Sequence, residues 1–362
     1  MSAEHNIKQR IARLQSFLSE QHLDGMIISR PENCRYFSGF TGSAGMLLIS
    51  NSATKLLTDS RYTEQAEKQT RGYEIIQYSS NPYATLDNAI QQLQMKNVGF
   101  EQDYITYDVF SKMRAILTKA VLVPSRVNHL RMVKDADELA AIKKAVAIAD
   151  AAFENILTFI RPDMSEQDIS FELEFQMRRL GAEKMAFDMI VASGQRGALP
   201  HGAPSAKKIV PGEMITMDFG AVYQGYHSDI TRTIVVGQAT PKQRKIYDLV
   251  LAAQLTGIQA TRAGLLGSEV DAKARQVIEA AGYGDFFGHG LGHSVGLTIH
   301  EEPRLSPSNT DTQLRENMVV TVEPGIYLPG WGGVRIEDTV VVSAAGCEVL
   351  TASSKELIEI NG

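Results

Sequence analysis

The sequence predicts a two-domain protein in which both domains combine helices and strands. Its 362 residues exceed one typical domain. Helical and strand patterns alternate over residues 60–125, which is typical of an α/β domain with its own sheet. The second half changes character and carries acidic residues on its predicted strands. We therefore expect an α/β (α+β) fold with one domain at residues 1–126 and a second at 127–362.

The first domain is expected to begin with a helix and three short strands. Apolar residues recur at helical spacing over residues 7–22. Short apolar runs at 25–29, 46–50 and 55–59 predict the strands, and the glycine-rich stretch 38–45 predicts a turn. These glycines lack the spacing of a phosphate-binding loop, and no Gly-Lys-Ser/Thr follows them.

The remainder of this domain is expected to alternate helices and strands. The predicted order is helix 62–70, strand 73–78, helix 85–93, strand 98–101, helix 107–117 and strand 121–124. A stretch without periodicity follows at 124–134. We expect the domain boundary between residues 125 and 135.

Helices and their start signals dominate the early part of the second domain. Ser165 and Asp168 form a predicted capping box, and Thr240-Pro241 places a cap residue before proline at the first helical position. The helices are expected at 135 to about 160, 166 to about 181, 241 to about 260, and 269–281. A strand is expected at 186–192, followed by a turn that carries His201.

Two strand patterns of the second domain form a hairpin with one acid on each arm. Apolar and polar residues alternate over 215–219, which puts Asp218 on the face opposite the apolar residues. A hairpin centred between Tyr223 and Gln224 would place Asp218 directly across from Asp229. Like charges in that position destabilise a hairpin, so we expect a cation between them.

A second hairpin repeats this arrangement. Folded about Gly330, it places Glu323 and Glu337 at equal distances from the turn. We interpret the two hairpins as a weak internal repeat, with chance similarity as the alternative. Tyr223 and Tyr327 lie near the two turns and receive no role.

Four carboxylates on strand faces make a poor core, because a buried charge costs several kcal/mol unless it is paired or bound to metal. Exposure on the strand explains any single one equally well, but explains the set badly. Two divalent cations would balance the four charges. Two metals about 3.5–4 Å apart bridge a hydroxide nucleophile and clamp the reacting oxygens, which is hydrolase chemistry.

Residues 287–301 hold His289, His293 and His300, interleaved with glycines. The glycines disfavour a helix and permit close approach of the backbone to a ligand or metal. A surface loop with incidental histidines is the simpler interpretation of any one histidine. With the acids, the cluster favours an oxygen-rich metal site with one imidazole, which suits manganese, cobalt, iron or zinc.

Composition excludes several other classes. The net charge of −6 argues against a nucleic-acid surface. Cys34 and Cys347 are too few for a disulfide framework and fit a reducing compartment. The N-terminus lacks the apolar core of a signal peptide, and no apolar run approaches the roughly 20 residues of a membrane helix. We expect a cytoplasmic protein that binds neither nucleic acid nor membrane.

Five short motifs occur in a fixed order in the second domain. They are Met-Asp-Phe-Gly-Ala at 217–221, Ser-Asp-Ile-Thr-Arg-Thr at 228–233, Gly-His-Gly-Leu-Gly-His at 288–293, Val-Glu-Pro-Gly-Ile-Tyr at 322–327 and Val-Arg-Ile-Glu-Asp at 334–338. Together they resemble the pita-bread metallopeptidases, which include methionine aminopeptidases, aminopeptidase P and prolidase. The resemblance covers the whole chain and implies a creatinase-like α/β domain before a pita-bread catalytic domain.

The resemblance also implies a function. Residues 39–45 and 59–62 look most like aminopeptidase P. A dinuclear exopeptidase that cuts between an N-terminal residue and a following proline, using a metal-bridging hydroxide, is therefore expected first. Xaa-Pro dipeptidase (prolidase) is the alternative. A non-catalytic peptide-binding relative is the contrasting class, which the complete ligand set disfavours.

Residue roles follow from the same resemblance. The implied metal ligands are Asp218 on one metal, Asp229 and Glu337 bridging both, and His293 and Glu323 on the other. The implied catalytic residues are His201, His289 and His300, which face the substrate. Arg335 is added from its position: it lies two residues before Glu337, on the same strand face by period two, and is expected to orient that carboxylate or meet a substrate carboxylate rather than to be a solvated surface arginine. Manganese is expected first, with cobalt, zinc or iron as alternatives. The expected partners are a peptide with proline in second position and a second subunit in a homodimer.

Overall fold

The computed structural model describes residues 3–361 and divides into two compact units, one ending at Arg131 and the other starting at Met132. The boundary expected at residue 126 lies before a short 3₁₀ helix, Asn128–Arg131. That helix belongs to the first unit because Arg131 Nη1 donates to Asn33 Oδ1 at 2.6 Å. The hydroxyl of Tyr36 also donates to Leu130 O at 2.7 Å.

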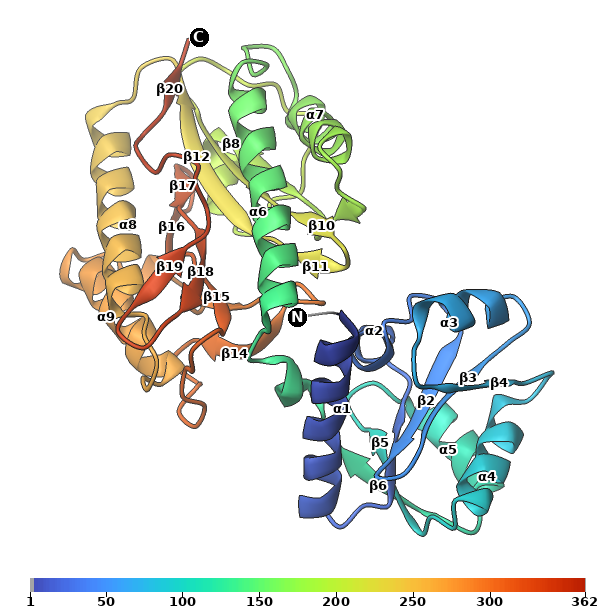
Figure 1. Ribbon diagram of the computed structural model, residues 1–362. Helices are drawn as coiled ribbons and strands as arrows, with labels where there is room; N and C mark the ends of the chain where they lie inside the picture. The colour runs from blue at the N-terminus through green and yellow to red at the C-terminus, as the bar shows by residue number, and fades with distance from the viewer. Residues whose placement is uncertain (1–2, 362) are drawn as a thin grey trace. The chain divides into compact units, whose positions relative to one another are not determined.

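The first unit contains one mixed sheet with strand order β4-β3-β2-β1-β5-β6 (Figure 1). Its strands are β1 Gly25–Ile28, β2 Gly45–Ser50, β3 Thr54–Thr58, β4 Glu74–Gln77, β5 Asn97–Glu101 and β6 Val121–Ser125. Its helices are α1 Ala3–Glu20, α2 Pro31–Ser38, α3 Thr63–Gln69, α4 Pro82–Gln92 and α5 Tyr107–Ile116. The alternation predicted from the sequence is confirmed.

Helix α2 is the α-helix of the first unit, within the described residues, that was not predicted from the sequence. The sequence feature that could have predicted this helix is Pro31 at its first position, where proline costs no hydrogen bond. The helix is short, and packing stabilises it: Cys34, Tyr36 and Phe37 are buried.

Over its described residues, 132–361, the second unit has four long helices, and each starts near the expected residue. They are α6 Ala136–Leu157, α7 Glu166–Arg179, α8 Pro241–Ala260 and α9 Gly267–Ala280. The capping boxes of Ser165 with Asp168 and of Thr240 with Gln243 are present. The cap predictions are confirmed because they depend only on residues three apart.

The strands of the second unit form two larger sheets and two small ones. The first large sheet has the order β20-β12-β9-β8 and the second β14-β13-β15-β18-β19. The large sheets comprise β8 Ile190–Ser193, β9 Met214–Phe219, β12 Ile230–Val236, β13 Gly292–Ser294, β14 Glu301–Leu305, β15 Val319–Val322, β18 Asp338–Val342, β19 Cys347–Val349 and β20 Glu359–Ile360. The small sheets comprise β7 Lys184–Met185, β10 Ala221–Tyr223, β11 Tyr226–His227, β16 Gly325–Leu328 and β17 Gly332–Arg335.

Each large sheet is covered by its own pair of helices, as Figure 1 shows for α6 and α7 beside the yellow strands and for α8 and α9 beside the red ones. Phe153 of α6 and Leu173 of α7 share a core with Met217 of the first sheet. Val250 of α8 and Ala274 of α9 share another with Val320 of the second. The unit therefore consists of two similarly built halves, in line with the repeat suggested by the two acidic hairpins.

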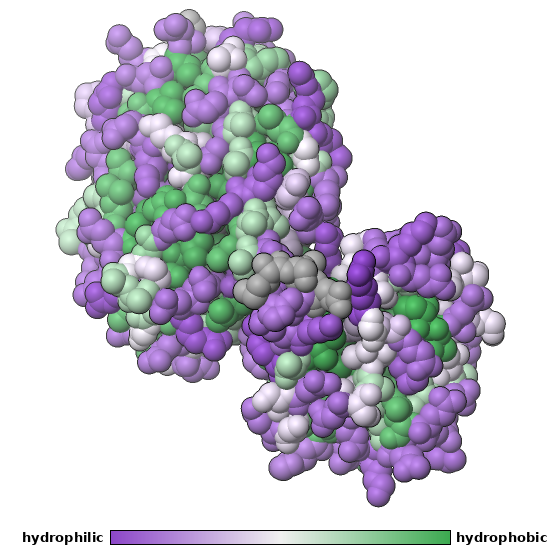
Figure 2. All heavy atoms as spheres, in the orientation of Figure 1, coloured by the Kyte–Doolittle hydropathy of each residue, from purple (hydrophilic) through white to green (hydrophobic). Residues whose placement is uncertain are grey.

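The surface is mainly polar on the face drawn in Figure 2, with apolar residues in scattered groups. Apolar side chains are instead concentrated in separate cores within the two units. Between residues 3 and 361, no helix is long and apolar enough to cross a membrane.

Candidate metal centre

The first acidic hairpin folds with a register different from the one predicted. Gln224 and Gly225 have φ angles of 46° and 72° and form the two-residue turn, so the hairpin is centred between them. Asp218 pairs with Thr231, not with Asp229. The predicted direct pairing is wrong. Moving the centre by one residue moves the partner by two, however, so Asp229 stays on the same face as Thr231.

The second hairpin has the predicted register about Gly330. Gly325 pairs with Arg335 in β16–β17, and Val322 pairs with Asp338 in β15–β18. The two ladders share one register but belong to different sheets, because Pro324 has no N–H to donate. Glu323 and Glu337 lie at this interruption, outside both ladders.

Three carboxylates meet between the two hairpins. One oxygen from each of Asp218, Asp229 and Glu337 lies within 4.8 Å of the others, and all three residues are buried. Asp218 Oδ1 and Glu337 Oε1 are buried without a hydrogen-bond partner among residues 3–361. Buried polar atoms are almost always satisfied, so two orphaned carboxylate oxygens fit a site that receives divalent cations.

His293 and Glu323 extend the cluster on one side. His293 Nε2 lies 3.5 Å from Asp229 Oδ2 and 3.4 Å from Glu323 Oε1. A Cβ on the preceding Gly292 would lie 2.0 Å from Thr321 O, so glycine allows β13 to approach β15 closely. The structure thus brings together all five residues that the motifs implied as ligands.

Burial shifts the pKa values of Asp229, Glu323, Glu337 and His293 in the direction that favours the uncharged form of each side chain. Burial, followed by repulsion from Glu337 and Asp218, raises the pKa of Asp229 well above its usual range. Burial likewise raises the pKa of Glu323 to about 7 and, with repulsion from Glu323 and Asp218, that of Glu337. Burial lowers the pKa of His293 to about 3, so its imidazole is neutral and able to bind a metal.

Arg335 contacts Asp218 directly and Glu337 through one intervening hydroxyl. Its Nη2 donates to Asp218 Oδ2 at 2.6 Å, and its Nη1 donates to the Tyr327 hydroxyl at 2.8 Å. Arg335 reaches Glu337 through Thr231: its Nε donates to Thr231 Oγ1 at 3.0 Å, and Thr231 Oγ1 donates to Glu337 Oε2 at 2.7 Å. The predicted roles of Arg335, orienting Glu337 or meeting a substrate carboxylate, stay predictions.

His201, His289 and His300 line the same cavity as four of the five clustered residues. The cavity measures about 1150 Å³, and its lining includes Asp218, Asp229, His293, Glu323, His201, His289, His300, Tyr327, Arg335 and Arg304. His289 Nε2 lies 2.9 Å from the Tyr327 hydroxyl, and the ring of His300 lies 4.4 Å from that of His293. Burial lowers the pKa of His289 to about 4 and also lowers that of His300.

Sequence reasoning missed three residues of this site. Tyr327 follows Glu323 by four residues, so period two placed it on the same face, and this was its available signal. Arg304 pairs with His293 across β13 and β14, and Thr231 pairs with Asp218 across β9 and β12. Their roles depend on strand register, which no local motif revealed.

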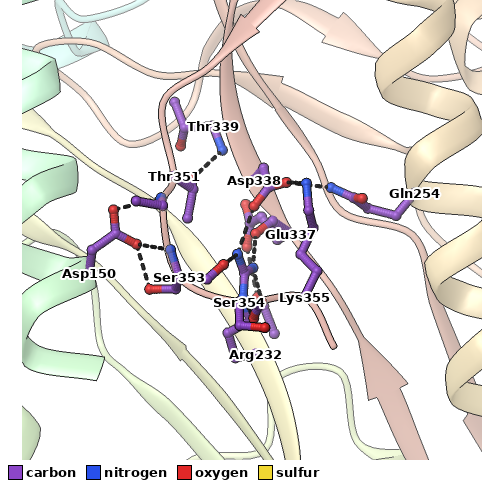
Figure 3. Close-up of polar contacts among 12 residues, drawn as sticks. Asp150, Arg232, Gln254, Glu337, Asp338, Thr339, Thr351, Ser353, Ser354 and Lys355 are labelled. Atoms are coloured by element: carbon purple, nitrogen blue, oxygen red, sulfur yellow. Dashed lines mark hydrogen bonds and ion pairs between the residues drawn. The ribbon is translucent and has the colours of Figure 1, made fainter. Parts of the chain in front are cut away.

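A second buried polar network includes the backbone oxygen of Glu337 and the neighbouring Asp338 (Figure 3). Arg232 donates to the backbone oxygens of Glu337 and Ser353 and, at 2.8 Å, to Asp338 Oδ1. Lys355 Nζ lies 2.6 Å from Asp338 Oδ2. Asp150 accepts from the backbone N–H groups of Ala352 and Ser353, so the C-terminal segment is bound at several points.

Comparison with known proteins covers both units. Residues 140–344 match Metallopeptidase family M24, and residues 10–133 match the Creatinase/Prolidase N-terminal domain. The chain is 38% identical to the Xaa-Pro dipeptidase of Pyrococcus furiosus over 97% of this chain and 100% of that protein.

Two solved structures are similar over nearly the full length. The Xaa-Pro dipeptidase from Bacillus anthracis has a TM-score of 0.96 and 48% identity, covering 98% of this chain and 100% of that one. The X-Pro aminopeptidase from Thermotoga maritima MSB8 has a TM-score of 0.91 and 39% identity, covering 97% and 100%.

Proposed function

The chain belongs to metallopeptidase family M24, and from this premise we propose that it hydrolyses Xaa-Pro dipeptides. The family confirms the resemblance read from the motifs, the fold class of a creatinase-like domain before a pita-bread domain, and hydrolase activity. Residues 39–45 and 59–62 had favoured an aminopeptidase. The Bacillus anthracis dipeptidase is more similar than the Thermotoga maritima aminopeptidase, so the prolidase alternative now takes precedence.

The observation that carries the dipeptidase proposal is Arg304. It lines the cavity on the strand that pairs with His293. No carboxylate within the described part of the chain forms an ion pair with it, whereas Arg335 on the same cavity is paired with Asp218. A guanidinium binds carboxylates strongly, and a dipeptide presents its C-terminal carboxylate one residue beyond the scissile bond. We therefore assign the binding of that carboxylate to Arg304.

The proposal assigns two divalent cations, manganese first, to the five clustered residues. Asp218 would hold one metal, Asp229 and Glu337 would bridge, and His293 with Glu323 would complete the other. The orphaned oxygens and the raised carboxyl pKa values support this assignment. When bound, the cations polarise the scissile carbonyl and lower the pKa of a water molecule.

The protein's own groups supply orientation and proton movement. Neutral His289 is held by Tyr327, whose hydroxyl is held in turn by Arg335. An imidazole ring offers two nitrogens for hydrogen bonding and proton transfer, so we assign His201, His289 and His300 to hold the carbonyl oxygen and to deliver a proton to the leaving proline nitrogen. A homodimer is part of the proposal, and light scattering of the purified protein tests it.

Substrate length decides between the two peptidase candidates. Manganese-loaded protein should be assayed side by side on Xaa-Pro and Xaa-Pro-Yaa peptides. Rapid cleavage of the dipeptide with slow or no cleavage of the tripeptide is expected. Release of the first residue from tripeptides at equal or higher rates would return the assignment to aminopeptidase. Binding of both without cleavage, with metals present, would favour a peptide-binding protein.

A further inference from the structure

Glu166 is a buried carboxylate outside the metal cluster that the proposed chemistry does not use. It is the first residue of α7, and its side chain is 0% exposed. A buried carboxylate is costly unless several hydrogen bonds satisfy it. Its position at the start of a helix lowers part of this cost, because the helix dipole stabilises a negative charge there.

The hydrogen-bond partners of Glu166 lie at both ends of one loop, residues 193–205, which we call the His201 loop. At the first end, Glu166 Oε1 accepts from Ser193 N at 2.8 Å and from Ser193 Oγ at 2.9 Å. At the other end, Oε2 accepts from Ser205 N at 3.1 Å and from Ser205 Oγ at 2.6 Å. Arg196 Nε contacts both oxygens, at 3.2 and 3.0 Å. One carboxylate therefore closes the loop at its base.

The same loop forms a wall of the cavity. Ala198, Pro200, His201 and Ala203 all line it. Arg335, which holds Asp218, donates to Pro200 O at 3.3 Å. A Cβ on Gly333 of β17 would lie 2.1 Å from Gly197 O, so the loop is seated tightly against the strand that leads to Glu337. A shift of the loop base would move His201 relative to the metal cluster.

We infer that Glu166 is a positioning residue that holds the His201 loop, and with it His201, against the reacting centre. The inference rests on the proposed function, because it assumes that His201 faces the substrate. Glu166 itself lies outside the cavity lining and supplies neither a metal ligand nor a proton. Its effect on catalysis should therefore pass through His201.

A double-mutant cycle tests this route. Glu166→Gln keeps the shape but offers one acceptor oxygen in place of two charged ones. It should lower kcat by roughly 10–100-fold, the usual cost of losing a supporting partner, with metal content near that of the wild type. In a His201→Ala background the same change should cost less than about threefold, because residues that act as a unit are non-additive. Equal losses in both backgrounds would overturn the inference.

Glu174→Gln is the matched control on the same helix. Glu174 pairs with Arg178 on the surface, and its loss should leave kcat unchanged. If Glu166→Gln folds poorly, Glu166→Asp keeps the charge and withdraws the carboxylate by one methylene. It should show the same dependence on His201.

Hydrogen exchange gives a readout that does not depend on activity. In Glu166→Gln, the amides of the His201 loop should exchange faster than in the wild type, while peptides containing Asp218 and Glu337 should be unchanged. Unchanged loop exchange would overturn the inference. If the wild-type protein cleaves no Xaa-Pro peptide, the proposed function fails, and the exchange measurement alone decides the role of Glu166.

Discussion

Glu337 and Asp338 are adjacent in the chain and both buried, yet their surroundings differ completely (Figure 3). Asp338 accepts from Arg232, Gln254 and Lys355, so the protein itself supplies its counter-charges. Glu337 accepts from Thr231 through one oxygen, and its other oxygen has no partner within residues 3–361. The difference distinguishes a structural acid from one whose counter-charge must come from outside the chain.

The largest effect is expected for Asp229→Ala, which removes one of the clustered acids whose counter-charge is proposed to come from bound metal. As a proposed bridge, Asp229 contacts both cations, so its loss should remove metal and activity together. The loss of turnover should exceed the roughly 10²–10⁴-fold that a single acid–base group contributes. Metal analysis and peptide assays of the purified variant measure both effects. Retention of two metals and full activity would show that the carboxylate cluster is not the site.

His300→Ala separates substrate-facing groups from ligands. Its imidazole lies beside His293 but is proposed to act on the substrate, so turnover should fall by about 10²–10⁴-fold. Metal content should stay near two per chain by the same analysis. Loss of metal as complete as in Asp229→Ala would make His300 a ligand and contradict the assignment.

Asp338→Ala tests the acid whose counter-charges come from the protein itself. It leaves Arg232 and Lys355 without their buried partner, and breaking a buried pair costs about 3–5 kcal/mol of unfolding free energy. Glu337→Gln in metal-free protein should cost little or stabilise, because it relieves repulsion among buried acids. Urea unfolding of both metal-free variants provides the comparison. Similar losses for the two would remove the distinction drawn between these neighbours.

Arg304→Met applies the same comparison to two arginines of the cavity: Arg335 is paired with Asp218, whereas Arg304 is proposed to pair with the substrate carboxylate. For Xaa-Pro dipeptides kcat/KM should fall by about 10–100-fold, consistent with about 1.5–3 kcal/mol for a hydrogen bond to a charged group. With Xaa-Pro amides, which lack the carboxylate, the substitution should matter little. An equal loss on both substrates would mean that Arg304 does not bind the carboxylate.

The pH dependence of metal binding gives the mildest test. Protonated carboxyl groups must release their protons to bind a cation, so affinity should rise with pH while Glu323 titrates near 7. The slope should be about tenfold per pH unit for each proton released. His293, with its pKa lowered to about 3, should release none in this range. Titration calorimetry in buffers of different ionisation enthalpy counts the protons. Affinity independent of pH between 5 and 7 would contradict the raised carboxyl pKa values.

Local signals account for what the sequence determined by itself. The capping boxes at Ser165 and Thr240 depend on neighbours within one turn, and the register about Gly330 follows from a symmetric hairpin. The five clustered residues could be identified from the sequence because each lies in a short motif, and the five motifs follow one another in a fixed order along the chain. Helix α2 escaped notice because its stability comes mainly from packing.

Tertiary structure decided how those residues are partnered. The turn at Gln224 required a positive φ at a residue other than glycine, which shifted the register and paired Asp218 with Thr231. Arg335 reaches Asp218 across 117 positions of sequence, and Glu166 reaches Ser205 across 39. A carboxylate's counter-charge depends on which distant side chains packing brings within about 3 Å, and no local pattern encodes that distance. The sequence therefore located the acids, and the fold determined which of them needs a cation from outside.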